Sequence, residues 1–258
     1  MPNDLPSLRV MVTRPAQQAG PLIQQLQAAG ASPWSFPLLE IVPCTSPQLD
    51  HLISHLEQYD IAIFISPNAV RYGVEAVNQR GAWPETLRLA TIGKGSAQAL
   101  EDRLGRAADI VPSSGSDSEA LLDTSALQNV DGKQILIFRG RNGRELLANT
   151  LRARGAQVDY AEVYERHRPK VDTAPLNTAL QTGALDVILI TSNEALDNLL
   201  NMVEPANLNA LYQIPLVVIH PRQAERAQQL GFRYNPILAQ DGSVDAIIKA
   251  LTSLRASA

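Results

Sequence analysis

The stretch Leu136–Leu147, which reads LIFRGRNGRELL, decides how this chain is interpreted. The run 134–138 predicts a buried parallel strand, the turn 139–144 is rich in glycine and arginine, and Glu145 opens an amphipathic helix. A helix N-terminus offers free N–H groups and partial positive charge, glycine permits close backbone approach, and arginine binds carboxylate or phosphate as a fork. Taken alone, the turn fits a solvated basic loop better than an anion site. The anion site therefore depends on similar turns recurring elsewhere.

Composition restricts the function classes. The chain has 258 residues, 45% hydrophobic and 19% charged, with a net charge of −4, which suits a globular protein of two domains or one large one. A negative balance gives no bulk attraction to nucleic acid or anionic membrane. The single cysteine, Cys44, excludes an intrachain disulfide and a cysteine-rich metal cluster. No secretory signal or membrane-length apolar run is recognised, so we expect a cytoplasmic protein.

Strand-like runs alternate with helix-like segments along the whole chain. Strands are expected at 8–12, 33–36, 61–65, 88–92, 108–111, 134–138, 158–164, 186–190, 215–219 and 233–238. Helices are expected between them, and a last helix at 244–254. Alternation of this kind is typical of parallel sheets covered by helices on both faces. The fold class is therefore α/β, with doubly wound, flavodoxin-like parallel sheets.

An internal repeat divides the chain in an unusual order. Ser66-Pro67-Asn68-Ala69 resembles Thr191-Ser192-Asn193-Glu194-Ala195, and Thr13-Arg14-Pro15 with its helix resembles Arg139-Gly140-Arg141 with its own. In the middle of the chain the Arg139 motif follows the Ser66 motif, whereas the similar Thr13-Arg14-Pro15 motif precedes the Ser192 motif. Two like domains, one inserted into the other, explain this order. We expect an outer domain of 1–38 plus 170–258, an inner domain of 43–165, and linkers at 37–43 and 165–170.

Every one of these motifs follows a predicted strand. In open parallel α/β sheets ligands bind beyond the carboxyl ends of the strands, and two such edges can face one cleft. The groups expected there are hydroxyls, amides and cations, with almost no carboxylate: Thr13, Arg14, Ser66, Asn68, Lys94, Ser96, Arg139, Arg141, Arg144, Ser192, Asn193 and Arg222. That set favours a polyanionic small molecule and suits a metal ion poorly.

The motifs together resemble the uroporphyrinogen-III synthase family over essentially the whole chain. The residues that carry the resemblance are Val12-Thr13-Arg14-Pro15, Pro37-Leu38-Leu39-Glu40-Ile41, Phe64-Ile65-Ser66-Pro67-Asn68-Ala69-Val70, Ile92-Gly93-Lys94-Gly95-Ser96-Ala97, Arg139-Gly140, Gly143-Arg144-Glu145-Leu146-Leu147 and Val163-Tyr164-Glu165-Arg166. Each motif alone is weak, whereas their order and spacing are fairly specific. The resemblance implies two doubly wound domains joined by a two-stranded ladder, in agreement with the insertion.

The resemblance also implies a lyase reaction. Linear hydroxymethylbilane would lose water to give an azafulvene on ring A. The substituted α-carbon of ring D would attack it through a spiro-pyrrolenine, and reclosure with ring D inverted would give uroporphyrinogen III. No cofactor or metal is expected, and neither nucleic acid nor a membrane is expected as a partner. We expect a monomer, and transient contact with hydroxymethylbilane synthase is left open.

Tyr164 is the residue that the resemblance assigns to catalysis, as the acid that assists loss of the hydroxyl, although a packing role at the domain junction is equally consistent with its position. For the substrate-binding residues, the motifs add the backbone of Ala69 and Gly140 to Thr13, Arg14, Ser66, Asn68, Lys94, Ser96, Arg139, Arg144, Ser192 and Asn193.

Two other patterns carry less weight. Gly93-x-Gly95-x-x-Gln98 follows a strand, but it lacks the third glycine and the acidic residue of a dinucleotide site. His51 and His55 have zinc spacing but no third ligand, so a solvated helix face is the better interpretation.

The rival function is a non-catalytic two-domain protein that closes on a small polyanion; it would bind its ligand without turnover.

Overall fold

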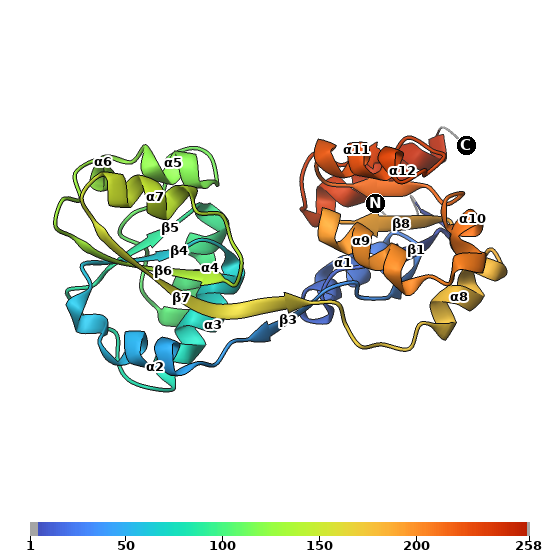
Figure 1. Cartoon of the computed structure of the whole chain (residues 1–258). Helices are drawn as coiled ribbons and strands as arrows, with labels where there is room; N and C mark the ends of the chain where they lie inside the picture. Colours follow the sequence, from blue (N-terminus) through green and yellow to red (C-terminus); the bar gives the residue numbers. More distant parts are fainter. Residues whose placement is uncertain (1–4, 257–258) are drawn as a thin grey trace. The chain divides into compact units, whose positions relative to one another are not determined.

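The structure, a computed structural model, describes residues 5–256 and contains two compact units (Figure 1). Unit 1 combines the two ends of the chain, up to Glu40 and from His167 onward, and unit 2 is Ile41–Arg166. Each unit is built on a five-stranded sheet flanked by helices. The predicted α/β fold class is confirmed.

Unit 1 contains a fully parallel sheet in the order β10-β9-β8-β1-β2. Its strands are β1 (Arg9–Val12), β2 (Ser32–Ser35), β8 (Val187–Ile190), β9 (Leu216–Val218) and β10 (Ile237–Leu238). Its helices are α1 (Ala16–Ala28), α8 (Ala174–Gln181), α9 (Asn193–Met202), η2 (Pro205–Asn207), α10 (Leu208–Leu211), α11 (Pro221–Gln229) and α12 (Val244–Ala256).

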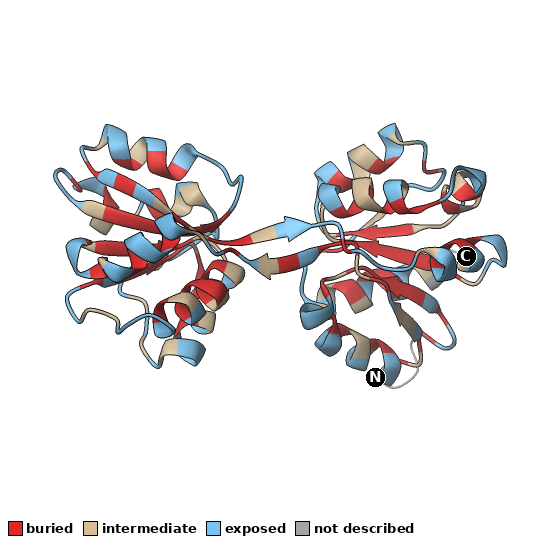
Figure 2. Ribbon diagram, turned by 60° about the horizontal axis from the view of Figure 1, so that its bottom comes forward, coloured by how far each residue is buried: buried red, intermediate tan, exposed pale blue. Residues whose placement is uncertain are grey.

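Alternating residues of the unit 1 strands build two separate cores. Val10 and Val12 pack with α1 and α12 on one face, whereas Met11 points into the core shared with α8, α9 and α11 on the other. Because successive strand residues face opposite sides, a strand covered on both faces must be apolar throughout. The run Val187–Ile190 meets that requirement and is buried over its whole length (Figure 2).

Unit 2 has the sheet order β3-β7-β6-β4-β5. Its strands are β3 (Glu40–Pro43), β4 (Ile61–Phe64), β5 (Arg88–Thr91), β6 (Gln134–Gly140) and β7 (Gln157–His167). Its helices are α2 (Pro47–Ser54), η1 (Leu56–Gln58), α3 (Pro67–Asn78), α4 (Lys94–Leu104), α5 (Ser118–Leu122), α6 (Ser125–Gln128) and α7 (Leu146–Ala153). Phe64 and Phe138 stack 4.6 Å apart in the core under α3, and Ile63 and Ile137 lie in the core under α7.

Several predicted elements differ from the structure. The expected strand 108–111 is reduced to a single bridge between Ile110 and Ala90, and the expected strand 233–238 to Ile237–Leu238. The helix expected between the strands 108–111 and 134–138 is two short pieces, α5 and α6. The segments expected as linkers are partly strand: β3 pairs with β7, in agreement with the two-stranded ladder that the resemblance implies, and β7 continues to His167, where the division between the units falls.

No helix in the described residues 5–256 has both the length and the apolar character needed to cross a membrane.

Candidate active site

The strand orders locate the ligand-binding edge of each sheet. Counted in chain order, the strands of unit 1 run 2-1-3-4-5 from β2 to β10, which is the flavodoxin-like order. In unit 2, β6 is counted as strand 1, β7 as strand 2, β4 as strand 3, β5 as strand 4 and the bridge at Ile110 as strand 5. The order from β7 to that bridge is then also 2-1-3-4-5. In such sheets the winding reverses between strands 1 and 3, and ligands bind beyond the carboxyl ends there. These switch points are β1/β8 in unit 1 and β6/β4 in unit 2.

Two serines occupy the same place at the two switch points. Ser66 caps α3 by accepting the N–H of Ala69 at 3.0 Å, and Ser192 caps α9 by accepting the N–H of Ala195 at 3.0 Å. A serine at the N-cap satisfies one of the free N–H groups of the first turn. Both serines are half-buried, so each hydroxyl is partly engaged by its own helix.

Thr13 and Arg14, both predicted to bind substrate, lie beyond β1. The hydroxyl of Thr13 is buried and donates to the carbonyl of Leu189, so it ties the end of β1 to β8. Arg14 is half-buried and donates to the carbonyl of Gly242, in the loop before α12. Burial lowers the pKa of Arg14 below its usual value. Asn193 is exposed as the first residue of α9.

Tyr164 reaches the edge of the unit 2 sheet because β7 contains a bulge. The pairing runs from Arg139–Glu162 directly to Gly140–Tyr164, so Val163 is the extra residue. A bulge re-aims the side chains that follow it. Without it, Tyr164 would share the face of Tyr160, which packs toward α7; instead Tyr164 is buried in the core under α3.

The hydroxyl of Tyr164 lies at the N-cap of α3. It is 3.3 Å from the hydroxyl of Ser66, and its ring lies against Gly140, where a β-carbon would approach within 2.6 Å. Asn68 follows in the first turn of α3 and is half-buried. The structure thus brings together the predicted residues Tyr164, Ser66 and Gly140 at the switch point of unit 2.

The buried arginine of the turn, Arg139, is directed into the protein. Its side chain is 3% exposed; Nη1 donates to Glu145 Oε1 at 3.0 Å and the guanidinium stacks on Tyr160 at 4.3 Å. The hydroxyl of Tyr160 donates to the other oxygen of Glu145 at 2.6 Å. The bond from Tyr160, and then that from Arg139, lowers the pKa of Glu145, whereas burial and this bond raise that of Tyr160.

The other two arginines of the turn lie at the surface. Arg141 forms an ion pair with Glu165 at 2.8 Å and lies 3.6 Å from Glu162, both in β7. Arg144 is exposed. Asn142 between them has φ of 62°, a left-handed conformation that asparagine tolerates.

Lys94 and Ser96 lie at the end of β5, one strand further along the same edge. Lys94 is the exposed first residue of α4, whereas Ser96 is buried and its hydroxyl is withdrawn from the surface. Arg222, in the first turn of α11, is exposed at the corresponding place in unit 1.

A cavity of about 440 Å³ opens beside the arginine turn of unit 2. One side is the turn itself, the other is the loop before α5, and the floor is apolar. Its lining residues are Ile65, Ile92, Ser116, Asp117, Ser118, Ile137, Arg139, Asn142, Gly143, Arg144, Leu147, Ala148, Tyr160 and Arg166.

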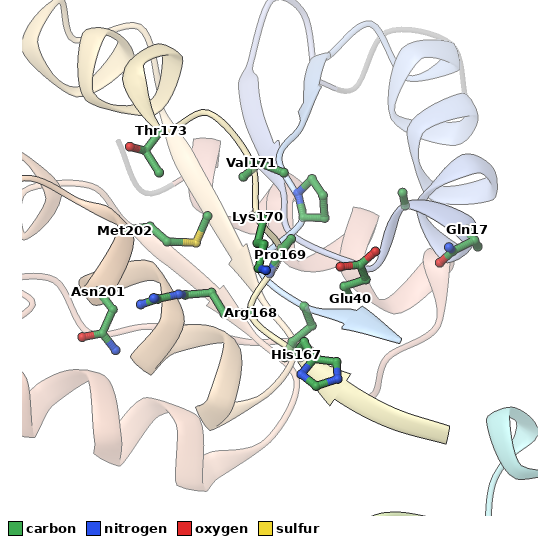
Figure 3. A pocket seen from close by; sticks show the side chains of 13 residues that line it. Gln17, Glu40, His167, Arg168, Pro169, Lys170, Val171, Thr173, Asn201 and Met202 are labelled. Carbon is green, nitrogen blue, oxygen red and sulfur yellow. The ribbon is translucent and has the colours of Figure 1, made fainter. Parts of the chain in front are cut away.

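Unit 1 contains a larger cavity of about 1010 Å³ that sequence reasoning missed (Figure 3). It lies between the first turn of α1 and the segment 167–173, and Figure 3 shows Arg168 extending toward Asn201. None of the four residues predicted to bind substrate in unit 1 lines it. The cavity is lined by His167, Arg168 and Lys170, which the sequence analysis assigns to the linker 165–170. The density of cations in this run is the signal that could have indicated an anion-binding cavity.

Among the side chains described in the structure, three or more histidine, cysteine, aspartate or glutamate residues do not gather anywhere in a group that could hold a metal ion. The rings of His51 and His55 lie 4.3 Å apart and are tilted by 44°, and a hydrogen bond links Nδ1 of His55 to the carbonyl of His51.

Comparisons with known proteins agree with the motifs and the fold. A model of the family described as uroporphyrinogen-III synthase HemD matches residues 20–248. The uroporphyrinogen-III synthase of Salmonella typhimurium is 34% identical over 248 residues, covering 95% of this chain and 100% of the relative. That of Escherichia coli is 32% identical over 247 residues, with the same coverage.

Solved structures share the architecture. A mutant uroporphyrinogen III synthase from Thermus thermophilus matches with a TM-score of 0.67 at 18% identity, covering 98% of this chain and all of that one. The enzyme from Helicobacter pylori matches with a TM-score of 0.62 at 16% identity, covering 96% of this chain and all of that one. At such identities the likeness concerns the fold alone, whereas the family match and the 32–34% relatives identify the lineage. The chain therefore belongs to the uroporphyrinogen-III synthase family.

Proposed function

We propose that this protein is a cyclising lyase that converts hydroxymethylbilane to uroporphyrinogen III with loss of water and inversion of ring D. Family membership supports the reaction, and the placement of Tyr164 is the observation on which the mechanism depends. The bilane closes by itself to the type I isomer. The enzyme must therefore hold the chain in a conformation that disfavours this closure and makes the spiro closure reachable.

Tyr164 is proposed as the acid that assists departure of the ring A hydroxyl. Its phenol lies beside Ser66 at the carboxyl edge of the unit 2 sheet, where α/β sheets bind ligands, and the bulge at Val163 brings it there. Ser66 is held by its bond from Ala69 N–H, so it can fix the direction of the phenol. A hydroxyl that passes its proton to a departing oxygen contributes as a general acid.

The carboxylate arms of the substrate are proposed to dock on the N-terminal turns of helices and on cations at the two edges. Exposed Lys94 and Arg144 and half-buried Ser192 suit this role directly. Arg14 and Arg139 contribute by holding the adjoining loops, because their guanidinium groups already bind Gly242 and Glu145.

The remaining features of the proposal concern the setting of the enzyme. The two units would act as domains, 1–38 plus 170–258 and 43–165, connected through 37–43 and 165–170. A cytoplasmic monomer that meets hydroxymethylbilane synthase transiently would receive the unstable bilane before it closes. Sedimentation of the purified protein alone tests whether it is a monomer. Sedimentation of a mixture with hydroxymethylbilane synthase tests the contact between the two proteins.

The reaction is tested by coupling the protein to porphobilinogen and hydroxymethylbilane synthase and separating the oxidised porphyrin isomers. We expect mainly type III with the protein present and type I without it. Type I alone in both reactions, from protein that remains folded, would contradict the proposal and favour the non-catalytic binding protein.

Tyr164→Phe tests the acid. We expect the rate to fall by about 10²-fold, the lower end of the roughly 10²–10⁴-fold contribution of general acids, with some activity remaining. Tyr72→Phe is the matched control: its ring lies 5.8 Å from that of Tyr164 and its buried hydroxyl donates to the carbonyl of Ile41. An unchanged rate in Tyr164→Phe would remove Tyr164 from the mechanism.

A further inference from the structure

The three arginines of the turn 139–144 differ in what they can offer a ligand. Arg139 is buried, with its charge compensated by Glu145, and Arg141 is paired with Glu165. Within the described residues, Arg144 has no hydrogen bond or ion pair with another side chain, and it is exposed. Of the three, Arg144 is therefore the arginine whose fork is available to an incoming carboxylate.

Arg139 gives the turn its shape instead of binding the ligand. Its guanidinium lies directly against Gly143, where any β-carbon would collide with it. The same guanidinium is fixed between Glu145 and the ring of Tyr160. The backbone from Gly140 to Glu145 is thus wrapped around a buried cation, which holds Arg144 at the rim of the 440 Å³ cavity.

The cavity combines an apolar floor with a polar rim. Ile65 and Ile92 directly follow β4 and β5, and Ile137 lies within the neighbouring strand β6. Leu147 and Ala148 come from the first turn of α7. The rim carries Arg144, Arg166, Ser116 and Ser118. Asp117 is the carboxylate among the lining residues, and one of its oxygens already caps α5 by accepting the N–H of Ala120 at 2.8 Å.

This combination suits a flat apolar ring that carries carboxylates. Small-molecule sites are mostly apolar, with a few placed polar groups, and occupy about 300–1,000 Å³. At about 440 Å³ the cavity accommodates one substituted ring, and is too small for a chain of four. An inorganic anion alone would leave the isoleucine floor without a partner.

We propose that this cavity binds a single pyrrole ring of the substrate, with Arg144 holding one of its carboxylate arms and Arg139 acting as the positioning residue of the turn. The proposal rests on the proposed function for the identity of the ring. It adds to that function a location in unit 2 and a division of roles between the arginines.

Porphobilinogen, a monopyrrole with one acetate and one propionate arm, is the direct probe. Titrated into the full-length protein, it is expected to shift the amide NMR signals of 142–144 and 116–118. Arg144→Gln is expected to weaken binding about tenfold, which corresponds to about 1.4 kcal/mol. Arg88→Gln is the matched control, because Arg88 is an exposed arginine at the amino end of β5 in the same unit.

Citrate at equal carboxylate concentration is the second probe, because it lacks the ring. Weaker binding of citrate than of porphobilinogen supports recognition of the ring, and equal binding overturns it. Unchanged porphobilinogen affinity in Arg144→Gln, or an equal loss in Arg88→Gln, would overturn the assignment of Arg144.

Kinetics separate this inference from the proposed function. For hydroxymethylbilane, Arg144→Gln is expected to raise KM about tenfold and leave kcat within about twofold, because Arg144 binds an arm remote from the reacting carbons. Wild-type protein that makes type III isomer while Arg144→Gln keeps the wild-type KM would overturn the inference and leave the function standing. Wild-type protein that makes only type I, yet binds porphobilinogen through Arg144, would overturn the function instead.

Discussion

The two switch points are built on the same plan but use their arginine differently. With Ser66 and Ser192 aligned, the pairing of β1 with β8 matches that of β6 with β4, which places Arg14 and Arg139 at equivalent positions. Arg14 reaches across to the carbonyl of Gly242 and so bridges two loops. Arg139 turns back to Glu145 in its own turn, and a cavity opens between that turn and the loop before α5. The hydrogen-bond partner of this arginine thus decides whether the arginine bridges two loops, as in unit 1, or leaves a cavity between them, as in unit 2.

Of the substitutions that test this comparison, Gly140→Ala should have the largest effect. Gly140, which follows Arg139, lies against the ring of Tyr164, and a β-carbon there would approach within 2.6 Å of a buried ring that has little room to move. We expect Gly140→Ala to lower the free energy of unfolding by about 3 kcal/mol, the upper end of the cost of overpacking. Because the ring must shift, kcat should fall as well. Urea unfolding and the coupled isomer assay measure the two effects.

Gly20→Ala is the matched control for Gly140→Ala. Gly20 is an exposed residue inside α1 in unit 1, with nothing within 4 Å of an added β-carbon. Alanine is favoured over glycine in a helix interior by about 1 kcal/mol, so stability should rise. A loss of the same size in both variants would mean that the Tyr164 contact is not responsible.

The next largest effect should come from removing the two arginines. We expect Arg139→Ala to destabilise unit 2 by about 2 kcal/mol, below the range for a broken buried pair because the side chain of Glu145 is 54% exposed and can be resolvated. Arg14→Ala should cost unit 1 about 1 kcal/mol, because it removes a single bond to a carbonyl from a half-buried side chain.

Tryptophan fluorescence can assign each loss to its unit. Trp34 lies in β2 of unit 1, and Trp83 packs near Phe64 and Phe138 in unit 2. In a Trp34→Phe background the emission reports unit 2, and in a Trp83→Phe background it reports unit 1. If Arg14→Ala proves as costly as Arg139→Ala, the two positions are anchored equally and the comparison above is wrong.

Most of the fold was predictable because it depends on local patterns. Fully buried strands such as Val187–Ile190 require uninterrupted apolar runs, and helices begin at residues such as Ser66 and Ser192 that cap them. Short elements at the sheet edge were not predictable. Ile110 forms one bridge and β10 has two residues, since an edge strand has one neighbour to fix its length.

The site was predictable by position but not by orientation. The motifs identified which residues follow the strands, because the polar sequence after an apolar run is visible. They could not give the direction of Arg139, which depends on Glu145 and Tyr160 meeting it in space. The bulge at Val163 was equally hidden, because no glycine or proline in β7 marks it. The cavities of both units likewise depend on loops that only folding brings together.

The two capping serines allow a closer comparison of the switch points. Ser66→Ala and Ser192→Ala should each lower the stability of their own unit by about 1 kcal/mol, since each loses one bond to a helix N–H. Ser66 also lies 3.3 Å from the hydroxyl of Tyr164, so Ser66→Ala should lower kcat, whereas Ser192→Ala should act mainly on KM. An identical kinetic change in the two variants would show that the contact with Tyr164 has no catalytic consequence.

The smallest expected effect is a pH dependence that one switch point has and the other lacks. Bonds from Tyr160 and Arg139 favour the ionised form of Glu145, so its pKa in the folded protein lies below that in the unfolded chain. The stability from this pair is therefore present above the unfolded pKa, about 4.3, and is lost as the pH falls through the folded pKa. Glu145→Gln should lower the urea midpoint of unit 2 slightly at pH 7, and the difference from wild type should shrink toward pH 3. Arg14 bonds to a carbonyl, which does not titrate in this range, so the difference caused by Arg14→Gln in unit 1 should stay constant. A Glu145→Gln difference that stays constant over the same range would mean that Arg139 is held by packing against Tyr160 and Gly143, and that the charge of Glu145 contributes nothing to the turn.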